Sequence, residues 1–68
     1  MSVFIKKTPS VTIEFRDGTP TIVHPFTYPI PRIGEYVHVK GRTHIVESIF
    51  YMYKDGELLR IEIHTKVN

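Results

Sequence analysis

Four histidines have the widest chemical range in this sequence, because imidazole binds metal ions and transfers protons near neutral pH. They are His24, His38, His44 and His64. A two-residue turn at Lys40-Gly41 places His38 opposite Thr43. If Arg42 joins the turn, His38 faces His44 instead. Even that pair brings no thiolate or carboxylate at metal-ligand spacing, so we expect no metal site and no cofactor.

Carboxylates and thiols, which carry much of enzyme chemistry, form no recognisable constellation. Asp17 and Asp55 each precede a glycine in a predicted turn, where hydrogen bonding to the backbone explains an aspartate. The glutamates fall at outward strand positions or beside turns, which does not predict a buried carboxylate pair. They are Glu14, Glu35, Glu47, Glu57 and Glu62. The chain has no cysteine and hence no thiolate nucleophile. We expect no enzymatic activity.

Length and charge narrow the class of protein. A chain of 68 residues predicts one domain, residues 1–68, with a thin hydrophobic core. Nine basic and seven acidic residues give a net charge of +2, which permits nucleic-acid binding without predicting it. The apolar run before Lys6 is too short for a signal sequence or a membrane span. We therefore expect a cytoplasmic protein with no membrane contact.

Alternating apolar and polar residues recur along the chain, as half-buried β-strands require. The clearest run is Val11 to Phe15, and further strands are expected over residues 21–24, 35–39, 43–53 and 58–67. Turns are expected at Asp17-Gly18, Lys40-Gly41 and Asp55-Gly56. The proline-rich stretch PFTYPIP, residues 25–31, cannot join a central strand and predicts a long irregular connection.

These elements predict an all-β fold, a small SH3-like barrel formed by an antiparallel meander of five strands. Residues 2–6 would supply a sixth, edge strand if they pair with the rest. A flat meander would leave long open edges, which favours closure into a barrel. A five-stranded OB-type barrel is the alternative, although the helix that such barrels place between strands has no counterpart here.

Both faces of the last predicted hairpin carry apolar or aromatic residues, although a small core needs only one. Uninterrupted pairing from the Asp55-Gly56 turn sets Tyr51 opposite Arg60 and Phe50 opposite Ile61. The expected core face then holds Val46, Phe50, Met52, Leu59, Ile61 and Ile63. The other face holds Glu47, Ile49, Tyr51, Tyr53, Leu58, Arg60, Glu62 and His64. A bulge at Glu47-Ser48 would exchange the faces partway along the strand.

The second face predicts a partner-binding surface made of Ile49, Tyr51, Tyr53, Leu58 and Arg60. The alternative is that Tyr51 and Tyr53 are packing partners across the strands of the barrel. The leading functional hypothesis is a non-enzymatic module that binds a protein. In it, aromatic side chains anchor the partner and the flanking charges set its register.

Two other functions could use the same residues. A single-stranded nucleic-acid-binding barrel would stack bases beside basic groups, here with Tyr36, Arg42, Tyr51, Tyr53 and Arg60. Nearby glutamates such as Glu47 and Glu62 would repel phosphate, which favours a protein partner. The third function is structural, as a homodimer, a larger homo-oligomer or a virion component.

Residues 31–49 read PRIGEYVHVKGRTHIVESI, with a proline, a hydrophobic-Gly-Glu turn, a valine-rich strand and a glycine turn. The positions concerned are Pro31, Gly34, Glu35, Val37, Gly41, His44, Val46 and Ile49. This stretch resembles a pattern in small SH3-like barrel proteins of bacteria and their phages, in which the position of His44 is often aromatic. The resemblance implies a barrel and a phage or mobile-element accessory protein, here one that docks on a host protein and modulates it. It brings no functional residue with it.

Overall fold

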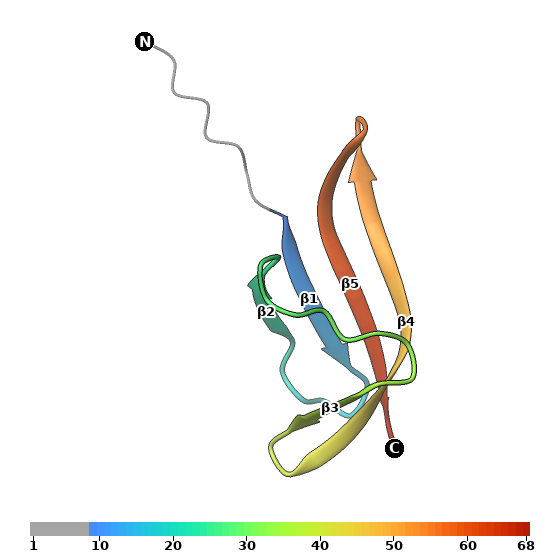
Figure 1. Cartoon of the computed structure of the whole chain (residues 1–68). Coiled ribbons are helices and arrows are strands. Elements are labelled where there is room, and N and C mark those ends of the chain that lie inside the picture. The colour runs from blue at the N-terminus through green and yellow to red at the C-terminus, as the bar shows by residue number, and fades with distance from the viewer. Residues whose placement is uncertain (1–8) are drawn as a thin grey trace.

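The computed structural model describes residues 9–68 and contains five β-strands in that range (Figure 1). They are β1 (Ser10–Phe15), β2 (Ile22–Pro25), β3 (Tyr36–Val39), β4 (Arg42–Lys54) and β5 (Glu57–Val67). No helix that could cross a membrane occurs in the part of the chain that the structure describes. The predicted strand over residues 2–6 lies outside the described residues.

The strands form one sheet in the order β2-β1-β5-β4-β3, which curls into a half-barrel. β1 and β2, β3 and β4, and β4 and β5 pair antiparallel, but β1 and β5 run parallel. The parallel pair follows from the odd number of strands. Chain direction alternates from each strand to the next, so the first and the fifth point the same way. The predicted small all-β barrel is confirmed, with a mixed sheet in place of a fully antiparallel one.

Both predicted two-residue turns are present. The φ angles are 50° and 77° at Lys40-Gly41 and 52° and 78° at Asp55-Gly56. Positive φ at both central residues is what a type I′ hairpin turn requires. His38 therefore pairs with Thr43, and its Nδ1 lies 3.1 Å from the Thr43 Oγ1. The register that would pair His38 with His44 does not occur.

The long irregular connection predicted at the prolines joins β2 to β3 through residues 26–35. Figure 1 shows it crossing one face of the sheet. Ile30 packs against the core from this connection. Its end is fastened to β4, because the Gly34 N–H donates to the Val46 carbonyl and the Val46 N–H donates to the Glu35 carbonyl, both at 2.9 Å.

The core lies on the inner face of the half-barrel, where β1, β4 and β5 meet. Its buried apolar residues are Val11, Ile13, Val46, Ile61 and Ile63. His44 and Thr65 are also fully buried. The Thr65 hydroxyl donates a hydrogen bond to the Glu14 carbonyl at 2.9 Å, which offsets the cost of burying it.

Two irregularities interrupt the pairing of β4 with β5. The first leaves Glu47 without a partner in the ladder, because Val46 pairs with Thr65 and Ser48 with His64. This β-bulge lies at Glu47, where the sequence offered one as the alternative to uninterrupted pairing. It bends the long strand β4 and increases its local twist, as bulges do.

The second irregularity, at Leu59, was not predicted and corrects the register. Tyr53 pairs with Leu58 as expected, but Met52 pairs with Arg60. Leu59, which lies between Leu58 and Arg60 in β5, is the extra residue and has no partner in β4. Tyr51 therefore lies opposite Ile61 rather than Arg60. The uninterrupted pairing is wrong over residues 48–52, where a shift of one residue moves each side chain to the other face.

The predicted core face is wrong in the same region. Phe50 pairs with Glu62 on the outer face, and the exposed fractions of Phe50 and Met52 are 49% and 37%. Leu59 lies at the bulge and is 45% exposed. Val46, Ile61 and Ile63 are buried as predicted. The hairpin thus contributes to the core near Val46 and Ile63, whereas the part toward the Asp55-Gly56 turn does not.

Candidate interaction surface

Residues 48–60, here called the arm, are the outer part of the β4–β5 hairpin, and their tip, residues 53–59, projects beyond the other strands (Figure 1). β1 begins at Ser10, which pairs with Arg60, and β3 pairs with β4 no further than Ile45. Within the described residues, β1 therefore reaches the arm only at Arg60, and no strand lies beside β4 along residues 48–54 on the side away from β5. Cross-strand pairs and the type I′ turn hold the arm in its hairpin form.

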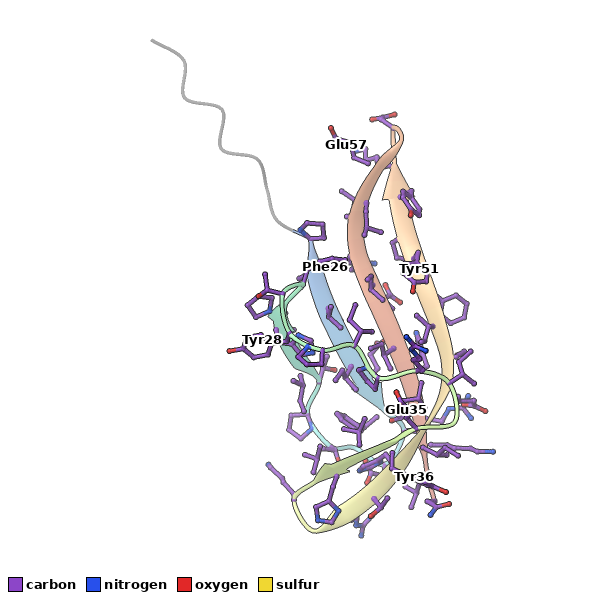
Figure 2. All side chains as sticks on the ribbon, in the orientation of Figure 1. Phe26, Tyr28, Glu35, Tyr36, Tyr51 and Glu57 are labelled. Atoms are coloured by element: carbon purple, nitrogen blue, oxygen red, sulfur yellow. The ribbon has the colours of Figure 1, made fainter. Side chains whose placement is uncertain are left out.

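The inner face of the arm continues the core face and carries Ile49, Tyr51, Tyr53 and Leu58. Ile49 and Leu58 pack partly against the core. Tyr51 and Tyr53 are 56% and 63% exposed, since no element in residues 9–68 covers them. Figure 2 shows Tyr51 high on β4, toward the tip at Glu57. The structure thus brings four of the five predicted partner-binding residues to one face.

Arg60, the fifth predicted residue, lies on the opposite face. It pairs with Met52, and its Nε donates to the Glu62 Oε2 at 2.6 Å. The Phe50 ring on this outer face meets the His64 imidazole edge to face, with ring centroids 5.0 Å apart. Apolar and aromatic side chains are therefore exposed on both faces of the arm, and the charges lie with the outer one.

The outer face also gathers a histidine and two carboxylates that the sequence did not predict to meet. The His64 Nε2 lies 3.0 Å from the Glu14 Oε2 and 3.4 Å from the Glu62 Oε1. Potential ligand atoms of Glu14, Glu62 and His64 all lie within 4.8 Å of one another. Hydrogen bonds from Arg60 and then His64 lower the pKa of Glu62. The Arg60 guanidinium already supplies a positive charge here, and an ion-pair network accounts for the arrangement.

From the sequence, carboxylates were considered only beside His38 and His44, and no signal in the sequence places Glu14 beside His64. The parallel pairing of β1 with β5 sets Glu14 beside His64, and an i, i+2 spacing along β5 adds Glu62 to the same face. Closure of the predicted barrel brings the first and last strands together, but the register that sets Glu14 opposite His64 could not be read from the strand pattern.

A second carboxylate and histidine meet at the other end of the half-barrel. Asp17 accepts a hydrogen bond from the Thr19 N–H at 3.0 Å, the local backbone contact that the sequence predicted for this turn. Its Oδ2 also lies 3.3 Å from an Arg42 nitrogen and 3.8 Å from the Nε2 of buried His44. Hydrogen bonds from Thr19, and then the nearby His44 and Arg42, lower the pKa of Asp17.

This lowered pKa predicts part of the acid sensitivity of the fold. A carboxyl whose pKa is lower in the folded chain than its ordinary value of 3.8 stabilises the folded protein at any pH above that value. This stabilisation disappears as the pH falls through the pKa of the folded state. We expect the free energy of unfolding to fall less steeply below about pH 4 in Asp17→Asn than in the wild type. Urea titrations at several pH values measure this. Parallel curves for the two proteins down to pH 2 would contradict it.

The residues of the nucleic-acid hypothesis do not form one surface. Tyr36 lies on β3 near the lower end of the half-barrel, far along β4 from Tyr51 (Figure 2). Arg42 is engaged by Asp17, and Arg60 by Glu62. Each of the two arginines therefore has a carboxylate neighbour. A base-stacking platform beside unpaired cations is not assembled from these residues.

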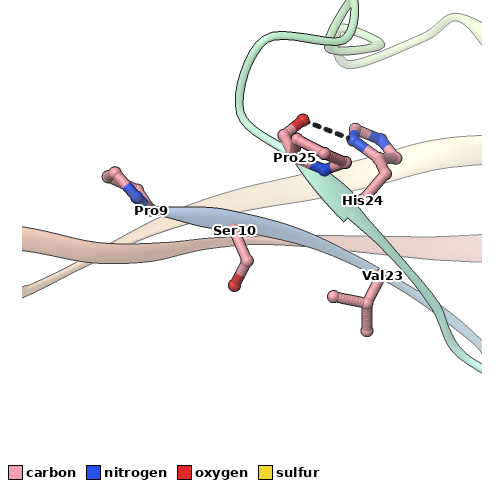
Figure 3. Close-up of a pocket in the computed structure, with 5 residues that line it drawn as sticks. All are labelled: Pro9, Ser10, Val23, His24 and Pro25. Atoms are coloured by element: carbon pink, nitrogen blue, oxygen red, sulfur yellow. Dashed lines mark hydrogen bonds between the residues drawn. The ribbon is translucent and has the colours of Figure 1, made fainter. Parts of the chain in front are cut away.

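A shallow hollow lies where β2 pairs with the start of β1. It is lined by Pro9, Ser10, Val23, His24 and Pro25 (Figure 3). The His24 Nδ1 lies 2.9 Å from the Pro25 carbonyl oxygen, and its ring stacks on Tyr28 at 5.2 Å. These contacts account for the placement of the imidazole. Among the described residues that line the hollow, His24 is the one with a titratable side chain.

Comparison of the chain with protein-family models, with curated proteins and with solved structures finds no match. The resemblance of residues 31–49 to SH3-like proteins of bacteria and their phages stays a prediction. The arm and the ion-pair clusters beside it must be interpreted from their own geometry.

Proposed function

We propose that this protein works by binding another protein through the arm, without catalysing a reaction. The observation that carries the proposal is the exposure of aromatic and apolar side chains on both faces of a hairpin that projects from the half-barrel. Monomeric proteins rarely expose contiguous apolar patches, and where they do, the patch commonly marks a site of interaction. Tyrosine and phenylalanine are typical anchors of such contacts.

The proposed contact uses Tyr51, Tyr53 and the edges of Ile49 and Leu58 on the inner face. A partner that clasps the arm would also cover Phe50 and Met52 on the outer face. Arg60 and Glu62 neutralise each other at 2.6 Å, so they would set the register of the partner rather than attract it over a distance. The resemblance to phage proteins extends the proposal to a host protein as the partner that is modulated.

The protein partner is favoured over a nucleic acid by the charges. The arginine of the arm is paired with Glu62, and Arg16 beside the arm is paired with Glu47. Glu57 adds a negative charge at the tip. A nucleic-acid surface would need unpaired cations to replace the counterions around phosphate. Binding that weakens steeply with rising salt would contradict the proposal, because the contact described here is mainly apolar.

Affinity capture from a bacterial lysate with nuclease added tests the proposal. Tyr53→Ala removes an anchor from the arm, and Tyr36→Ala is its matched control, because Tyr36 is 61% exposed but lies off the arm. We expect one protein to be retained by the wild type and by Tyr36→Ala. For purified partner, Tyr53→Ala should weaken binding by about 30-fold, the effect of losing a contact worth about 2 kcal/mol.

Equal loss of binding in both variants would contradict a role for the arm. So would full binding by Tyr53→Ala, Tyr51→Ala and Phe50→Ala in turn. Near-ultraviolet circular dichroism of each variant shows whether the half-barrel is intact. Recovery of nucleic acid alone, before nuclease treatment, would favour the single-stranded nucleic-acid hypothesis.

A further inference from the structure

The outer edge of β4 is open along residues 48–54. β3 pairs with β4 over its first residues, from Arg42 to Ile45, and the loop hydrogen bonds reach Val46. Beyond that point, no backbone group within residues 9–68 pairs with this edge. Figure 1 shows no ribbon past β4 along the arm. A strand edge of this kind is a template for another strand.

Within residues 9–68, the edges formed by β2 and β3 are protected and this one is not. β2 and β3 have four residues each, and β2 ends at Pro25, which has no N–H to offer. Residues 48–54 read SIFYMYK, with no proline or glycine and one charge at the end. Natural sheets avoid such long apolar edges unless something covers them.

The turn fixes which backbone groups point outward. Lys54 and Glu57 close the two-residue turn, and a closing pair exchanges both of its hydrogen bonds. Lys54 therefore directs its N–H and C=O toward β5. By alternation, Tyr53, Tyr51 and Ile49 direct theirs away from β5, into the open edge.

The loop contacts of Val46 agree with this assignment. Val46 uses both its N–H and its C=O outward, toward Glu35 and Gly34. Strict alternation along β4 would direct the backbone groups of Val46 toward β5, like those of Lys54. The bulged residue Glu47 inserts one position and moves Val46 to the outward set.

We propose that a second copy of this chain pairs antiparallel with this edge, about a two-fold axis through Tyr51. Tyr51 then lies opposite the second copy's Tyr51, and Ile49 opposite the second copy's Tyr53. A two-fold axis perpendicular to the sheet keeps inner faces together, which requires pairing between odd-numbered residues. Among such registers, this one gives partners to the outward groups of all three residues.

Side chains are self-complementary in the same register. Phe50 comes beside the second copy's Met52 on the outer face, so two exposed apolar groups cover each other. Lys54 comes opposite the second copy's Ser48 and next to its Glu47, whose carboxylate lies 2.8 Å from Arg16, so no like charges are placed opposite each other at the ends of the paired segment. The contact is isologous and closed, so pairing uses up the edge instead of continuing into a fibre.

The pairing concerns the edge of the arm, whereas the proposed function concerns its faces. Edge-to-edge pairing would join the two inner faces into one continuous aromatic surface and leave it open to a partner. The dimer therefore goes beyond the docking proposal and does not depend on it. Its test uses purified protein alone, so failure of one proposal is distinguishable from failure of the other.

Charge variants at the two-fold axis test the proposal in the full chain. Tyr51→Lys and Tyr51→Glu each place like charges opposite each other, which destabilises a cross-strand pair. We expect each variant alone to be a monomer in sedimentation-velocity runs in which the wild type is a dimer. An equimolar mixture should recover the dimer. Tyr53→Lys, which would face the second copy's Ile49, is the control and should lose less association than either Tyr51 variant.

Hydrogen exchange supplies the second readout. In a dimer, the amides of Ile49, Tyr51 and Tyr53 exchange more slowly as protein concentration rises, and the melting temperature rises with it. A wild type that stays monomeric at every concentration would overturn the proposal. Protection of these amides that does not change with concentration would assign the edge to another segment of the same chain. Dimers of both charge variants, or no recovery on mixing, would overturn the register.

Discussion

Ile61→Ala is expected to leave most of the protein unfolded at 25 °C. Ile61 is fully buried in the middle of β5, where it lies between Val11 of β1 and Tyr51 of β4. Truncation of a buried isoleucine to alanine costs about 2–5 kcal/mol, because apolar contacts are lost and a cavity remains. A core of this size supplies about 3–5 kcal/mol in all. Urea denaturation followed by circular dichroism measures the loss.

Phe50→Ala is the matched control. Phe50 is 49% exposed on the outer face, and its removal is expected to cost about 1 kcal/mol or less. Both variants are compared at the lowest workable protein concentration, so that any self-association contributes little. A loss in Phe50→Ala as large as that in Ile61→Ala would contradict the observed register and restore uninterrupted pairing, in which Phe50 faces Ile61 inside the core.

The strands and turns could be predicted because their signals are local. Alternation of side chains marks each strand, and Lys40-Gly41 and Asp55-Gly56 supply the positive φ that type I′ turns need. The extra residue at Leu59 has no such signal. Leu59 lies between Leu58 and Arg60, and both of these neighbours fit a continuous strand. The exchange of faces over residues 48–52 therefore came from a bulge that the pattern does not mark.

Pairing between distant strands was less predictable than the strands themselves. Closure between β1 and β5 brings Glu14 beside His64 and thereby forms the cluster on the outer face. Strand direction alternates along the chain, so five strands require a parallel contact at closure. Closure into a barrel was predicted, but the sequence states neither the register of the contact between β1 and β5 nor that the sheet stays open between β2 and β3. Residues 26–35, which connect β2 to β3, are rich in proline and cannot pair as a strand. β2 and β3 are therefore joined by a loop and lie at the two edges of the sheet.

The sequence predicted that Tyr51 and Tyr53 are exposed, but it placed them on the face opposite the core. Both side chains are exposed, but they lie on the core side of the hairpin. Tyr53 lies beyond Ser10, where β1 begins, whereas Tyr51 lies level with Val11 through Ile61. Their exposure results from the lack of a covering element within residues 9–68 and not from an outward orientation. Which elements cover a strand depends on where the other strands begin, which is a property of the whole sheet.

His44→Leu is expected to stabilise the protein by about 1–2 kcal/mol near neutral pH. His44 is fully buried, and neither of its ring nitrogens has a hydrogen-bond partner within residues 9–68. Its ring packs edge to face on Phe15 at 4.6 Å, as an aromatic core residue would. A buried polar group without a partner costs about 1–3 kcal/mol, which exceeds what the aromatic contact contributes. Thermal and urea unfolding measure the gain.

His38→Leu is the control, since His38 is exposed and its substitution should change the free energy of unfolding by about 0.5 kcal/mol or less. A gain confined to His44→Leu would mean that the imidazole lowers stability where it lies, 3.8 Å from the Asp17 carboxylate. A loss in His44→Leu would instead assign a stabilising contact to the imidazole, with Asp17 as its nearest anion. Asp17→Asn combined with His44→Leu then separates the two cases, because the double variant loses no more than the larger single loss if the two side chains act as a pair.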